Sequence, residues 1–120
     1  LYSAIVLFNL ALASHREGRL GSEKCLKKAT VLYGTVLQLL TSSPMPNDIS
    51  ASLLIVLALN NKAQIHHDQC QYEESSACLT KISAIMGDVY ALHSALYQKD
   101  FEGILLNVML LSAPTVAQAA

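Results

Sequence analysis

The residues best suited to chemistry lie in one short cluster, which contains His66, His67, Asp68 and Cys70. Imidazole, carboxylate and thiolate groups are all ligands of zinc. Neighbouring residues of a helix point about 100 degrees apart, so His66 and His67 do not easily bind one ion, and the HExxH and paired CxxC motifs do not occur in the chain. A metal-dependent enzyme is therefore the most distant function that the sequence suggests, and we expect no metal and no cofactor.

No local motif supports nucleophilic catalysis or nucleotide binding. A catalytic Cys or Ser needs a base within reach, but Cys78 falls on an apolar helical stripe, and Cys25 lies at a surface position without a predicted pocket. Glu73 and Glu74 stand where a helix is expected to begin, where negative charge suits the helix dipole. The phosphate-binding patterns GxGxxG and GxxxxGK[ST] are absent. We therefore expect that the protein is not an enzyme.

The composition leaves few charged residues to cover the surface. The 120 residues are 52% hydrophobic and 14% charged, whereas about 25% of residues are charged in an average soluble domain. A net charge of -1 gives no general attraction for nucleic acid. The first residue is Leu1 rather than Met, which favours a C-terminal piece of a longer chain. This composition predicts one domain that packs against partners or belongs to something larger.

Cysteine usage and the length of the apolar runs bear on the compartment. Three cysteines without paired spacing argue against a disulfide framework and favour a reducing intracellular compartment over secretion. The strongest apolar runs fall well short of the roughly 20 residues that span a bilayer. We therefore expect no membrane span.

Sparse Gly and Pro residues favour an all-α fold. A first helix is expected from about Ser3 to Arg16, closed near Gly18 by a left-handed residue. Ser22 can cap the second helix with its hydroxyl oxygen. The expected buried face of that helix contains Leu26, Ala29, Tyr33, Val36 and Leu40.

Two further helices are expected after a linker that holds two of the three prolines. The third, capped by Asn47 or Asp48, reaches about Asp68, and its centre is apolar nearly all round, so it must be covered on more than one side. The fourth runs from about Glu73 to Met86, and its apolar stripe contains Ser75, Cys78, Leu79, Ile82 and Met86. A fifth helical region, from Asp88, is one helix or two pieces.

The segment NNKAQIHHDQCQYEESSACL, residues 60–79, resembles the middle of a tetratricopeptide (TPR) repeat, a helix-turn-helix unit that stacks. Ala11 and Ala63 stand where the TPR pattern has Gly or Ala, which lets the neighbouring helix approach. The turn position at which the pattern has Gly holds Gly18 in the first unit and Cys70 in the second. A looser likeness to TPR-like proteins of algae, in FNLALASH and LLNVMLL, implies no function.

Repetition of one short pattern agrees with this resemblance. An Asn follows a Leu by two residues at Asn9, Asn61 and Asn107, with separations of 52 and 46 residues, whereas a regular TPR array repeats at about 34 residues. The resemblance therefore implies an irregular TPR-like α-solenoid of about five helices. Its implied parts are unit 1 (1–41), a linker (42–48), unit 2 (49–87), a capping helix region (88–112) and a tail (113–120).

In TPR proteins the first helices of the units form the inner groove, where side-chain amides hold the backbone of a ligand peptide. The resemblance implies that the groove side also includes His15 and Arg16. Buried amides usually form hydrogen bonds within the fold, so Asn61 is equally well interpreted as a residue that joins two helices. For Asn9 and Asn107 this structural role is favoured over partner binding. The candidate partner-binding residues are Asn9, Asn60, Asn61, Gln64, His67 and Asp68.

Two interpretations of function remain beside the distant enzyme. The first is a scaffold or adaptor that binds a protein or peptide in a helical-repeat groove, with amides fixing its register. The alternative is a small structural subunit, permanently buried in a larger assembly, which high apolar content and low charge favour. Neither the partner nor the organelle is indicated by these residues.

Overall fold

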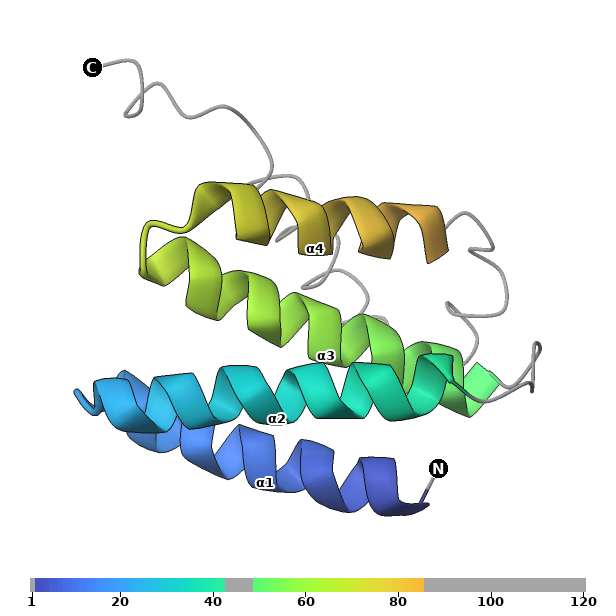
Figure 1. The fold of residues 1–120 in the computed structure, drawn as a ribbon, viewed down its shortest axis with the longest axis horizontal. Helices are drawn as coiled ribbons and strands as arrows, with labels where there is room; N and C mark the ends of the chain where they lie inside the picture. The colour runs from blue at the N-terminus through green and yellow to red at the C-terminus, as the bar shows by residue number, and fades with distance from the viewer. Residues whose placement is uncertain (1, 43–48, 86–120) are drawn as a thin grey trace, which may run out of the picture.

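The described part of the chain, residues 2–42 and 49–85 of the computed structural model, consists of four α-helices. They are α1 (Tyr2–Arg19), α2 (Glu23–Thr41), α3 (Ile49–Asp68) and α4 (Tyr72–Ile85). The helices alternate in direction and stack in chain order, with α1 and α4 at opposite edges (Figure 1). The all-α prediction is confirmed, and the fifth helical region expected from Asp88 lies outside the described residues.

The first hairpin, α1 with α2, turns over three residues. Leu20 N–H donates to the carbonyl oxygen of Glu17 at 3.1 Å, and Gly21, with a φ of 120°, holds the left-handed backbone of the turn. Helix α1 ends at Arg19, close to the predicted end near Gly18, but the left-handed residue is Gly21, and Gly18 is a buried residue inside α1. Ser22 caps α2 as predicted, since its Oγ accepts a hydrogen bond from Cys25 N–H at 3.2 Å.

Gly18 permits the close approach of the two helices. A Cβ at this position would lie 2.5 Å from Cγ and Cδ2 of Leu26 and 2.9 Å from the Leu26 backbone nitrogen. The backbone atom cannot move aside as the end of a flexible side chain can. Glycine is therefore required here for packing between α1 and α2, and not for the turn.

The second hairpin, α3 with α4, closes through a Schellman motif. Gln71 N–H donates to the His66 carbonyl at 2.8 Å, and Cys70 N–H donates to the His67 carbonyl at 3.0 Å. Cys70 occupies the left-handed position that usually holds glycine, with a φ of 60°. Beyond this turn, the buried hydroxyl of Ser75 donates to the carbonyl oxygen of Ala63 at 3.0 Å and ties α4 to α3.

The core is formed by two clusters that meet on α3. Tyr33, fully buried on α2, is the largest side chain of the cluster between α1, α2 and α3, and Leu79 and Ile82 belong to the cluster between α3 and α4. Because α3 contributes to both clusters, its apolar residues are covered on more than one side, as predicted. Most residues of the two predicted buried faces are buried, namely Ala29, Tyr33, Val36, Ser75, Cys78, Leu79 and Ile82. Leu26 and Leu40, which were also predicted to be buried, are half-buried.

None of the helices within 2–42 and 49–85 combines the length and the apolar character that crossing a membrane requires.

Candidate functional site

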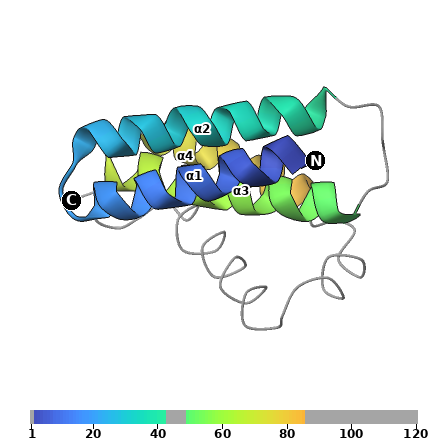
Figure 2. The same cartoon turned by 90° about the horizontal axis from the view of Figure 1, so that it is seen from below.

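A cleft of about 210 Å³ lies between the ends of α1 and α3, which are the first helices of the two hairpins. In Figure 2, where the stack is seen from below, α1 and α3 run on the same side of α2. We call this hollow the polar cleft; its lining residues are Leu12, His15, Arg16, Arg19, Asn61 and Gln64. Two guanidinium groups, an imidazole and two side-chain amides therefore share one small cleft, a set suited to binding a polar or acidic group.

A chain of hydrogen bonds beneath the polar cleft joins three helices. Asn60 Nδ2 donates to Asn61 Oδ1 at 3.4 Å, and Asn61 Nδ2 donates to the hydroxyl of Tyr33 at 3.3 Å. The same hydroxyl lies 3.2 Å from His15 Nδ1. An amide nitrogen can only donate, so the Tyr33 hydroxyl oxygen accepts from Asn61, and its proton and its second lone pair remain for the bond with His15 Nδ1.

The surroundings of His15 and Tyr33 keep both groups neutral near pH 7. Burial lowers the pKa of His15 from its ordinary value of 6.5, and the charge of Arg19 lowers it further, while Asp68 acts in the opposite direction. Burial raises the pKa of Tyr33 to about 12, against a smaller opposing effect of the hydrogen bond from Asn61. The positive charge at the polar cleft therefore comes from the arginines and not from the imidazole.

The structure brings together four of the residues that the sequence placed on the groove side. Asn61 and Gln64 on α3 and His15 and Arg16 on α1 all line the polar cleft. Arg19 was not predicted, although it stands three residues after Arg16 and so falls on the same side of α1. The amide of Asn61 ties α3 to α2, in agreement with its structural interpretation, and it also borders the cleft, while its binding of a partner stays a prediction.

Four other candidate residues do not line the polar cleft. Asn9 is exposed on α1, and the side chain of Asn60 is buried, with 7% of its surface exposed. The imidazole of His67 packs edge-on against the ring of Tyr72, with centroids 5.3 Å apart, and Asp68 is exposed at the end of α3. The predicted polar side of α3 therefore reaches the cleft only through Gln64 and its neighbour Asn61.

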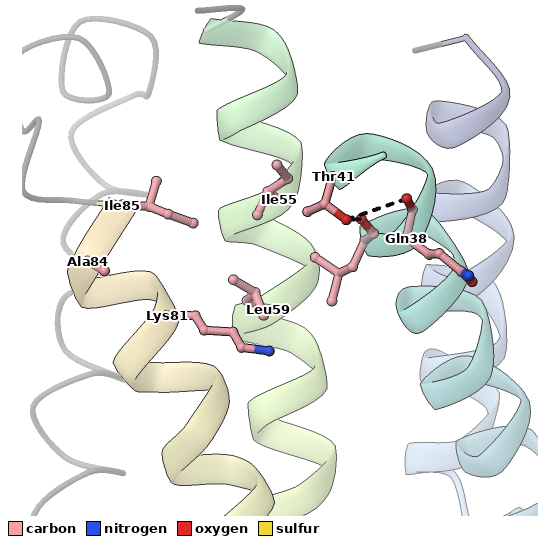
Figure 3. A pocket seen from close by; sticks show the side chains of 8 residues that line it. Gln38, Thr41, Ile55, Leu59, Lys81, Ala84 and Ile85 are labelled. Atoms are coloured by element: carbon pink, nitrogen blue, oxygen red, sulfur yellow. Dashed lines mark hydrogen bonds between the residues drawn. The ribbon is translucent and has the colours of Figure 1, made fainter. Parts of the chain in front are cut away.

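A second hollow, which the sequence did not predict, has a volume of about 380 Å³ and lies where α2, α3 and α4 meet. Figure 3 shows Ile55 and Leu59 of α3 facing Ala84 and Ile85 of α4, with Lys81 extending along the opening. We call it the apolar groove; its lining residues are Leu37, Gln38, Thr41, Ile55, Leu59, Lys81, Ala84 and Ile85. Because these residues come from three helices, periodicity within any single helix does not reveal the groove.

The side chains considered as zinc ligands engage different partners. His66 Nδ1 lies 2.6 Å from Gln71 Oε1, while His67 packs on Tyr72. Within the described helices and turns, His, Cys, Asp and Glu side chains do not gather in any group of three or more that could hold a metal ion. The described residues therefore present no donor set for a metal centre.

All three cysteines are free thiols, and each has a different environment. Cys70 is exposed, Cys25 is half-buried and Cys78 is buried. Burial raises the pKa of the Cys78 thiol, although Lys62 and Lys81 oppose this shift. A raised pKa makes a thiol a weaker source of thiolate, so Cys78 is suited to packing within the α3–α4 cluster.

Comparison of the chain with protein-family models, with curated proteins and with solved structures finds no match.

Proposed function

We propose that the protein is a TPR-like helical-repeat module that binds a peptide or protein surface in the polar cleft and catalyses no reaction. The observation that carries this proposal is the position of the cleft, between the first helices of two successive hairpins. The TPR resemblance implies a partner-binding groove in that position. Ala11 and Ala63, both fully buried, are consistent with the role of small residues in close helix packing.

The cleft offers two kinds of contact to a peptide. The amide of Gln64 can donate to a backbone carbonyl and accept from a backbone N–H. Arg16 and Arg19 form no ion pair with any residue in the described part of the chain, so they can bind a carboxylate of the partner. We therefore expect the preferred peptide to carry an Asp or Glu side chain.

A permanently buried structural subunit remains a second candidate, and the surface of α1 favours it. Tyr2 is 85% exposed and Val6 is 56% exposed, although both lie on a helix whose opposite side packs into the core. Exposed apolar side chains that gather on one outer face of a helix are typical of an interface. A subunit of this kind would aggregate or remain insoluble when produced without its partners.

Selection from a random peptide library displayed on phage, with the purified chain as bait, tests the proposed function. We expect enrichment of acidic sequences, and we expect a synthetic peptide made from them to bind at least tenfold more weakly to Arg19→Glu. Lys28→Glu is the matched control, because it makes the same charge change at an exposed position on α2 outside the cleft. Gln64→Ala should also weaken binding, and its half-buried position makes loss of folding a small concern.

Failure to enrich any peptide, or equal binding by the wild type and Arg19→Glu, would contradict the proposed function. A soluble chain that co-purifies from cells with other proteins at fixed stoichiometry, and that binds no free peptide, would support the structural subunit instead.

A further inference from the structure

His15 belongs both to the buried hydrogen-bond chain and to the wall of the polar cleft. Its side chain is 6% exposed, and its ring meets the Tyr33 ring edge-on, with centroids 5.9 Å apart. Nδ1 bonds to the Tyr33 hydroxyl, whereas Nε2 bonds to no other residue of the described part. Among the described residues, no fully buried side-chain nitrogen or oxygen lacks a partner, so Nε2 is accessible. Because this side chain lines the polar cleft, a group bound there can reach Nε2.

Charged and polar groups from three helices surround His15. They are two guanidinium groups, one phenol, one carboxylate and two neutral amides, namely Arg16 and Arg19 of α1, Tyr33 of α2, and Asp68, Asn61 and Gln64 of α3. Burial, and to a smaller extent the charge of Arg19, lowers the pKa of His15, whereas the charge of Asp68 acts in the opposite direction. The protein alone therefore favours a neutral imidazole near pH 7.

A carboxylate bound by Arg16 and Arg19 would change this balance. Its negative charge offsets that of Arg19 and favours the imidazolium form of His15. An imidazolium donates from both ring nitrogens, so Nε2–H can bond to the carboxylate and Nδ1–H to the Tyr33 oxygen. That oxygen has two lone pairs and can accept from His15 and Asn61 together. Protonation of His15 therefore preserves the buried chain of hydrogen bonds.

We infer that the acidic side chain of the partner peptide enters the polar cleft together with one proton from solvent, and that His15 holds this proton while the peptide is bound. The cleft measures only about 210 Å³, so a carboxylate inside it lies close to the guanidinium groups and to the imidazole. Release of the peptide returns the proton to solvent. This inference rests on the proposed function and adds to it a dependence of peptide binding on pH.

The sign of that dependence follows from linkage. The bound carboxylate raises the pKa of His15, so the complex takes up the proton at a higher pH than the free protein does. Affinity therefore increases as the pH falls through the pKa of the complex, and it levels off once the free protein is protonated as well. An Asp or Glu side chain of the peptide titrates near pH 4 and stays ionised at about pH 5.5. We expect about tenfold tighter binding at about pH 5.5 than at about pH 7.5.

Isothermal titration calorimetry of the selected acidic peptide at these two pH values tests the inference. The wild-type dissociation constant should be about tenfold smaller at the lower pH. In His15→Gln the dissociation constant should be the same at both pH values, because an amide does not titrate. His67→Gln is the matched control, since it removes an imidazole that packs on Tyr72 outside the cleft, and it should keep the wild-type ratio. Circular dichroism at both pH values checks that each protein is folded.

Nuclear magnetic resonance of the His15 ring protons tests the same inference without a selected peptide. The probe is glutamate blocked as its N-acetyl, N-methylamide derivative, at roughly 50 mM to allow for a dissociation constant in the millimolar range. The midpoint of the His15 titration should move to higher pH with this probe. The equally blocked glutamine, which has the same shape and no charge, should leave it unchanged. Because the wild-type chain is used, an unfolded variant does not obscure the result.

Three results would overturn this inference. Wild-type binding that is equal at the two pH values, or weaker in acid, would show that no proton enters with the peptide. A His15→Gln variant with the wild-type ratio would place the proton on another group, and a His15 midpoint that ignores the glutamate probe would exclude the coupling. Failure of the proposed function looks different, because the chain would then select no peptide, and the glutamate probe would still decide whether His15 takes up a proton.

Discussion

Asn61 Nδ2 donates a hydrogen bond to the hydroxyl of Tyr33 at 3.3 Å and joins the second hairpin to the first. The hydroxyl also bonds to His15 Nδ1, so one buried phenol connects α1, α2 and α3. Because Asn61 also lines the polar cleft, this bond fixes the orientation of an amide that is available to a partner. The proposed binding of a partner would therefore be coupled to stability at this residue.

Removal of the Tyr33 hydroxyl should destabilise the fold while leaving the ring in place. Tyr33→Phe leaves Asn61 Nδ2 and His15 Nδ1 without their shared partner, and an unsatisfied buried polar group costs about 1 to 3 kcal/mol. Urea unfolding followed by circular dichroism measures the free energy of unfolding. Tyr2→Phe, at an 85% exposed position, is the control and should match the wild type. Equal stability of all three proteins would show that the hydrogen bonds contribute nothing.

The lowered pKa of His15 predicts a loss of stability in mild acid. His15 titrates near 6.5 in the unfolded chain and below that value in the folded one, so the unfolded state binds the proton first as the pH falls. The contribution of His15 is therefore fully present above pH 6.5 and decreases as the pH falls through its folded pKa. Urea unfolding at about pH 7.5 and about pH 5.5 measures the change.

His15→Gln separates this effect from all other titrations, because its amide can still form a hydrogen bond with the Tyr33 hydroxyl but does not titrate. The free energy of unfolding of the variant should depend less steeply on pH than that of the wild type. Identical pH dependence in both proteins would mean that His15 has the same pKa in the folded and unfolded states.

Two glycines in helices should respond in opposite directions to alanine. A Cβ on Gly18 would meet the Leu26 backbone nitrogen at 2.9 Å, so Gly18→Ala should cost about 1 to 3 kcal/mol. A Cβ on Gly34 would meet only Lys62 Nζ, at an ordinary 3.8 Å, so Gly34→Ala should gain up to about 1 kcal/mol of helix propensity. Thermal melts show whether the melting temperature of each variant lies above or below that of the wild type. A stabilised Gly18→Ala would contradict the close approach of α1 and α2.

The left-handed backbone of Cys70 predicts that glycine is the better residue there. A side chain at positive φ costs roughly 1 to 2 kcal/mol, which glycine avoids. Cys70→Gly should therefore be about 1 kcal/mol more stable than Cys70→Ala, since both variants lack the thiol and only one keeps a Cβ. Chemical denaturation of the pair checks this, and a more stable alanine variant would be inconsistent with the Schellman motif.

Local chemistry made much of the fold predictable. The Ser22 cap and the buried stripe of α4 follow from patterns within a few residues, and the structure confirms the cap and the stripe from Ser75 to Ile82, while Met86 lies outside the described residues. Gly18 was misassigned because a glycine near the end of a helix has two uses, to close a turn or to admit a neighbouring helix. Only the contact with Leu26, on the other helix, decides between them.

The candidate site was less predictable because it depends on contacts between hairpins. Helical periodicity placed Gln64 on a polar side of α3, but it did not show that Tyr33 would bond to Asn61 from 28 residues away. His67 shares that polar side yet turns to Tyr72, because the turn after α3 brings the aromatic ring against it. The apolar groove needed three helices to be placed together, which no single stretch of sequence encodes.

The two three-residue turns have a consequence for the order of folding. Loops this short close with little loss of chain entropy, so contacts within each hairpin are local and should form quickly. The bond between His15 and Tyr33 lies within the first hairpin, whereas the bond from Asn61 needs the second. On a ribosome, the N-terminal hairpin can therefore pair before α3 has been synthesised, and Tyr33 then already has one partner when Asn61 arrives.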